Sequence, residues 1–83
     1  MLSPDYRLVR ILVDEEIERA VNEAAESRRI LRAGPFAGLL LRSYPNSGLT
    51  GEDLVNEIAL AASHAGVAVE LGRAEELRTP HYA

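Results

Sequence analysis

Four arginines and a tyrosine are the side chains in this sequence best suited to bind a ligand. Arg28, Arg29 and Arg32 lie within five residues of one another, and Arg42 and Tyr44 follow. Guanidinium groups bind phosphates and carboxylates through paired hydrogen bonds, and a tyrosine ring can stack on a base. These five residues are our predicted binding site. They would make the polar contact with a partner protein or a second copy of the chain, or they would hold a phosphate, a carboxylate or a nucleic-acid backbone. The alternative is that the arginines only neutralise the carboxyl end of a helix.

Acidic residues gather further along the chain, where Glu52, Asp53 and Glu57 begin a helical segment. They could pair with the arginines, either inside one chain or across a dimer. Exposed ion pairs are weak, so such contacts would set orientation more than affinity. The alternative is a solvated helix face.

The two histidines do not indicate a metal site. His64 would share a helix face with Glu57, but two helical turns separate them by roughly 10 Å. A metal ion prefers helical ligands three or four residues apart. His81 lies near the end of the chain, and there is no cysteine to supply a thiolate. We therefore expect no bound metal and no cofactor.

No group of residues indicates an active site. Serines and threonines are present, but none lies in a recognisable nucleophile elbow. The turn over residues 47–51 has glycines but no lysine, and Glu52 and Asp53 would repel an anion there. We predict no catalytic residues and a protein that is not an enzyme.

Composition places the chain among acidic globular proteins. It is 47% hydrophobic and 27% charged, with a net charge of −4, which argues against disorder and against generic nucleic-acid binding. All of the basic residues other than histidine are arginine, and alanine is abundant. We interpret this composition as bacterial-like. The first residues lack the pattern of a signal peptide, and the longest apolar run is too short to cross a bilayer. We expect a cytoplasmic protein with no membrane contact.

The clearest element is a helix over residues 51–65. Thr50 and Asp53 have the spacing of a capping box, and apolar residues recur behind them at helical spacing. Gly66 is a natural residue to end this helix. Residues 67–71 are apolar and flanked by glycines, which is typical of a short strand that needs a partner.

The first third of the chain has two interpretations. In the one we favour, residues 7–13 form a strand that pairs with residues 67–71, and a helix follows over residues 15–33. In the other, a single helix begins at residues 3–5 and runs to the same end. Both end the helix at residues 34–35, Gly-Pro, which is a strong stop signal.

The predicted fold is a mixed α and β domain, with two main helices on a short sheet of about three strands in the order β-α-β-α-β. This order requires residues 36–44 to be a strand, although an apolar run of this length also fits a short helix. The alternative is a mainly α hairpin or bundle with one short C-terminal strand. In both, residues 1–72 form one small domain and residues 73–83 a polar tail.

Such a small domain with open sheet edges exposes apolar surface that a partner can cover. We therefore predict a small non-enzymatic interaction or accessory module that forms a homo-oligomer, expected to be a dimer, or docks on a larger protein. Two other hypotheses stay open. One is binding of a nucleic acid or an anionic ligand through Arg28, Arg29, Arg32 and Arg42. The other is a small enzyme whose site is shared between subunits.

Overall fold

The computed structural model of this protein describes residues 5–72, along which five elements follow one another. They are α1 (Asp5–Ser27), β1 (Leu31–Arg32), α2 (Ala33–Ser43), α3 (Gly51–His64) and β2 (Val69–Glu70). The protein thus has the mixed α and β class that the sequence predicts. The predicted tail over residues 73–83, with His81, lies outside the described residues.

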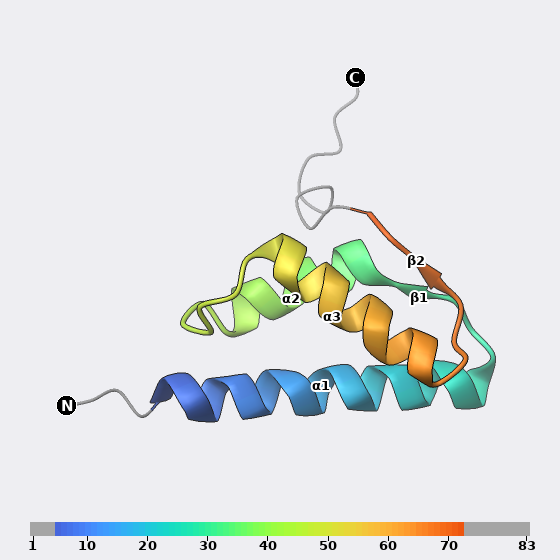
Figure 1. The fold of residues 1–83 in the computed structure, drawn as a ribbon, viewed down its shortest axis with the longest axis horizontal. Helices are drawn as coiled ribbons and strands as arrows, with labels where there is room; N and C mark the ends of the chain where they lie inside the picture. The colour runs from blue at the N-terminus through green and yellow to red at the C-terminus, as the bar shows by residue number, and fades with distance from the viewer. Residues whose placement is uncertain (1–4, 73–83) are drawn as a thin grey trace, which may run out of the picture.

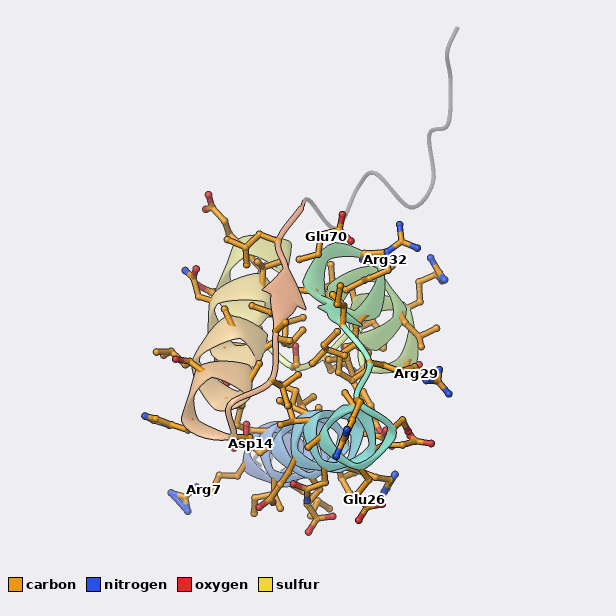
Figure 2. The ribbon with its side chains drawn as sticks, turned by 90° about the vertical axis from the view of Figure 1, so that its right-hand side faces the viewer. Arg7, Asp14, Glu26, Arg29, Arg32 and Glu70 are labelled. Atoms are coloured by element: carbon orange, nitrogen blue, oxygen red, sulfur yellow. The ribbon has the colours of Figure 1, made fainter. Side chains whose placement is uncertain are left out.

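Three helices enclose the core, and the two strands close one end of it. In Figure 1, α1 runs along one side, α2 and α3 lie over it, and the strand pair lies at the end where α1 and α3 finish. Figure 2 looks onto that end and shows the side chains of the three helices meeting between them. α3 packs against both α1 and α2. The buried apolar residues are Val13, Ile17, Val21, Ala24, Ala33, Ala37, Leu40, Leu54, Val55, Ile58, Ala62 and Val67.

The N-terminal segment is a helix, so the strand that we favoured over residues 7–13 is wrong. Val13, Ile17 and Val21 recur at helical spacing, and all three are buried on one face of α1. A strand would interrupt this apolar face in its middle. The competing single-helix interpretation is confirmed for residues 5–27.

The strand predicted over residues 67–71 is confirmed at its centre as β2, but its partner is β1. The two strands are parallel, with Leu31 paired to Val69 and Arg32 to Glu70. The described sheet has these two strands only, and the observed order is α-β-α-α-β instead of the expected β-α-β-α-β.

Residues 34 and 35 begin a helix, so their prediction as a stop signal is wrong. α1 has already ended at Ser27, and α2 starts at Ala33, which puts Pro35 in its first turn. The first N–H groups of a helix have no acceptor inside it, so proline loses no hydrogen bond there. Residues 36–44, left open between strand and helix, are therefore helical up to Ser43.

The helix predicted over residues 51–65 is confirmed as α3, together with its capping box. The Asp53 backbone N–H donates to the Thr50 hydroxyl oxygen at 3.0 Å, and the Thr50 N–H donates to the Asp53 carboxylate at 3.0 Å. Both bonds satisfy N–H groups that the helix itself cannot. Gly66 follows the helix with a φ of 72°, as its position predicted.

Candidate functional site

The arginines at residues 28 and 29 are positioned by the way α1 ends. Arg28 has a φ of 56°, in the left-handed region. Its N–H donates to the Ala25 carbonyl at 3.4 Å, and the Arg29 N–H donates to the Ala24 carbonyl at 2.9 Å. This is a Schellman ending, which turns the chain sharply after the helix. Both arginine side chains are exposed, and within residues 5–72 neither forms an ion pair.

Arg32 lies on β1 and already has an acidic neighbour. Its Nε lies 3.4 Å from Glu70 Oε1 on the paired strand, and both side chains are mostly exposed. Figure 2 shows Arg29 and Arg32 on the same side of the molecule. The structure therefore brings Arg28, Arg29 and Arg32 to one end of the domain, beside the two strands.

Arg42 and Tyr44 lie at the other end of α2. Arg42 is exposed in the last turn of that helix, and Tyr44 is its C-cap residue. Ten residues of helix separate Arg42 from Arg32, which is roughly 15 Å. The Tyr44 hydroxyl donates to Glu16 Oε2 at 3.4 Å, so this ring is tied to α1. The five predicted residues thus fall into two separate groups.

An open hollow of about 300 Å³ lies beside the first group, between the turn after α1 and the turn after α3. Arg28 and Arg29 stand on one side of it, and residues 66–68 line the other. The structure thus places the exposed Arg28 and Arg29 beside one hollow, and Arg42 at the far end of α2. Binding of an anion by Arg28 and Arg29 stays a prediction.

A second hollow, of about 410 Å³, lies between α1 and α3. We call it the α1–α3 hollow. Its floor is apolar and its rim is polar and largely acidic. The lining residues are Asp14, Ile17, Glu18, Val21, Asn22, Glu57, Ala61, His64 and Ala65. The small side chains at residues 61 and 65 leave the space between the two helices unfilled.

Arg10 joins α1 to α3 through Asp14 and Glu57, two of the residues that line this hollow. Its Nη2 donates to Glu57 Oε2 at 2.5 Å, and its Nε lies 3.6 Å from Asp14 Oδ1. Within one chain, Glu57 therefore pairs with Arg10 instead of the arginines at residues 28–32, and pairing with those arginines across a dimer stays a prediction. Arg10 was not among the residues predicted to be functional. The available signal was its four-residue spacing to Asp14, which brings two side chains together only on a helix.

The outer face of α1 carries an unexpected apolar surface. Leu8, Ile11 and Leu12 are 57%, 51% and 38% exposed. Their spacing of three and four residues puts them side by side on a helix, on the face away from the buried Val13. We call these three residues the α1 stripe. The other large exposed apolar side chains, such as Leu39 and Leu60, are spread over other elements.

The described residues contain neither a grouped set of metal ligands nor a helix that could span a membrane. Within residues 5–72, no three histidine, aspartate or glutamate side chains are grouped so that they could hold a metal ion. Among the same residues, no helix has the length and apolar character needed to cross a membrane.

Comparison with known proteins identifies no relative of this chain: no protein-family model, curated protein or solved structure matches it.

Proposed function

We propose that this chain is a small, non-enzymatic protein-interaction module and that the α1 stripe is its main contact surface. The observation that carries this proposal is the exposure of Leu8, Ile11 and Leu12 together on one helix face. Single exposed apolar residues are ordinary on protein surfaces, whereas adjacent ones favour an interaction site. We further propose a cytoplasmic location, on the sequence grounds given above.

The α1 stripe lies on a helix that is anchored to the rest of the domain by its opposite face. The opposite face of the same helix contributes Val13 and Ile17 to the core, and Arg10 ties it to α3. The backbone that carries the stripe is therefore already formed before binding, so only side-chain freedom has to be lost there.

Photo-crosslinking tests this proposal in cells that produce the protein. A benzophenone amino acid replaces Ile11 in one variant and Glu26 in a control variant. Both positions are exposed on α1, but Glu26 lies four helical turns beyond the stripe among charged residues. We expect protein adducts from position 11 well in excess of those from position 26. Equal yields of protein adducts at the two positions would contradict the proposal.

A second function, binding of an anionic ligand, is supported by the hollow beside Arg28 and Arg29. It predicts retention of the protein on a polyanion such as single-stranded nucleic acid, falling steeply with salt. The double variant Arg28→Ala/Arg29→Ala should lose this retention, and Arg42→Ala should keep it. No retention of the wild-type chain at low salt would rule this function out.

The third hypothesis, an enzyme with a shared site, draws only on the α1–α3 hollow. That hollow holds His64 and three carboxylates, but its lining includes no serine or threonine nucleophile. Two of the carboxylates, Asp14 and Glu57, are already beside Arg10. We therefore rank this hypothesis last.

A further inference from the structure

The α1 stripe has a positive charge before it and a negative charge after it. Arg7 precedes Ile11 by four residues, and Glu15 follows it by four. Both side chains are exposed, and neither forms an ion pair with the side chains that the structure describes, those of residues 7–72. Figure 2 shows Arg7 pointing away from the core, on the outer side of α1. The apolar surface is thus flanked by two exposed groups of opposite charge.

The charges that flank the α1 stripe are complementary between two copies of the chain when their α1 helices run in opposite directions. In an antiparallel pair of α1 helices centred on Ile11, Arg7 of each copy lies opposite Glu15 of the other. In a parallel pair, Arg7 would face Arg7 and Glu15 would face Glu15, and both contacts would be repulsive. A two-fold axis makes each favourable contact occur twice.

We propose that the α1 stripe binds a second copy of this chain, in an antiparallel α1–α1 contact with Ile11 at the two-fold axis. This deepens the proposed function and rests on it, because it names the partner of the same surface. Leu8 and Leu12 of both copies cover the apolar centre of the contact, and the two Arg7–Glu15 pairs set its direction.

The contact is limited to the N-terminal half of α1. Beyond Glu15 the outer face carries Glu18, Arg19 and Glu26, which are all exposed, so it offers no further apolar surface. Three side chains that are about half exposed cannot supply the roughly 1,000 Å² that a stable interface buries. The dimer is therefore weak, and it forms at a dissociation constant on the order of 0.1 mM.

Engineered cysteines test the geometry directly, because the natural chain has none. Ile11→Cys should form a disulfide dimer under mild oxidation, whereas the control Glu26→Cys should not. When Arg7→Cys and Glu15→Cys chains of different tag length are mixed in equal amounts, the mixed dimer should clearly exceed the two homodimers taken together, because random coupling would make it only equal to their sum. A preference for the 7–7 and 15–15 homodimers would overturn the antiparallel arrangement.

A charge exchange tests the same contact without a covalent bond. Arg7→Glu and Glu15→Arg should each weaken association about threefold to tenfold, because each turns two attractive pairs into repulsive ones. The double variant restores both pairs and should associate within about twofold of the wild-type chain. Sedimentation up to about 1 mM protein measures this range, and helical circular dichroism confirms that each variant is folded. A double variant as weak as either single variant would overturn the proposal.

The two proposals fail in different ways. If the wild-type chain stays monomeric at the highest concentration while position 11 crosslinks to other proteins, the second-copy proposal is overturned and the interaction module stands. If position 11 gives no excess adduct and the chain is monomeric, both proposals are overturned.

Discussion

Arg28 shows how one residue ends a helix at an energetic cost. Among the described residues outside glycine, it alone has a positive φ, a conformation that costs an L-residue roughly 1–2 kcal/mol. Two hydrogen bonds offset this strain, because the turn gives the backbone N–H groups of Arg28 and Arg29 carbonyl acceptors. α3 ends in the same way, with Gly66 at the matching position and Val67 donating to Ala62 at 2.8 Å.

This comparison predicts that Arg28→Gly stabilises the protein. Glycine removes the left-handed strain but adds freedom to the unfolded chain, so the net gain should be about 0.5–1 kcal/mol. Chemical denaturation measures the change. The control is Arg29→Gly, which removes a neighbouring arginine at a residue without positive φ and should leave stability equal or lower. Destabilisation by Arg28→Gly would show that the arginine side chain contributes more than the strain costs.

At the scale of elements, the start of α3 depends on a charge. The hydrogen bond from the Thr50 backbone N–H holds the pKa of Asp53 below its usual value. The hydrogen bond with the Thr50 side chain also lowers this pKa, burial opposes both with a smaller effect, and the positive charge of Arg10 makes the smallest contribution, again lowering it. The folded state therefore favours the ionised carboxylate, which also suits the positive end of the helix dipole.

The pH dependence of stability follows from this direction. A carboxyl whose pKa is lower in the folded state stabilises the protein above its unfolded pKa of about 4 and loses that contribution as the pH falls through the folded value. Asp53→Asn should therefore be less stable than the wild-type chain at neutral pH, and the difference should shrink in acid. Urea denaturation at both pH values measures it.

The control for this experiment is Thr50→Ser, which keeps both capping hydrogen bonds and should keep the wild-type pH dependence. A difference between Asp53→Asn and the wild-type chain that stays constant with pH would show that the charge of Asp53 is not involved.

The helix ends also explain how the sheet forms. In both α1 and α3, three residues lead from the left-handed position to the paired strand residue: Arg28 precedes Leu31, and Gly66 precedes Val69. α1 and α3 run in the same direction in Figure 1. Because they also end in the same way, the two strands that follow them are parallel and in register. The sheet is thus a consequence of the two matching helix ends more than of strand propensity.

At the scale of the whole molecule, stability depends on one core at the meeting of the three helices. Ile58 on α3 is fully buried there, while Leu60, two residues further, is 62% exposed. A small domain buries only about 60% of its unfolded surface, so each buried methyl group is a large part of the total stability.

We expect Ile58→Val to destabilise the protein by roughly 1 kcal/mol, because it leaves a cavity of one methylene. The melting temperature should fall by about 4–8 °C. Leu60→Ala removes more atoms from the same helix, yet it should change stability by less than about 0.5 kcal/mol since the site is exposed. A larger loss for Leu60→Ala than for Ile58→Val would contradict this core. Thermal unfolding by circular dichroism measures both.

Local signals in the sequence determined α3 and what flanks it. The capping box at Thr50 and Asp53, the ending at Gly66 and the strand at β2 all follow from neighbouring residues, so the chemistry that decides them lies within a few positions. The mixed fold class was predictable for the same reason. The five candidate binding residues could be selected by type, but their separation into two groups could not.

The N-terminal helix, the partner of β2 and the exposed face of α1 were decided only by the tertiary structure, because each of them depends on residues far apart in the chain. The apolar pattern over residues 7–13 fits a strand or a helix, and the packing of Val13 and Ile17 against α3 selects the helix. β2 finds its partner at β1, residues 31–32, and no local pattern contains that choice. The same packing decides that Val13 is buried while Ile11 faces outward. A sequence shows which residues are apolar, but only the positions of the neighbouring helices show which of them are left uncovered.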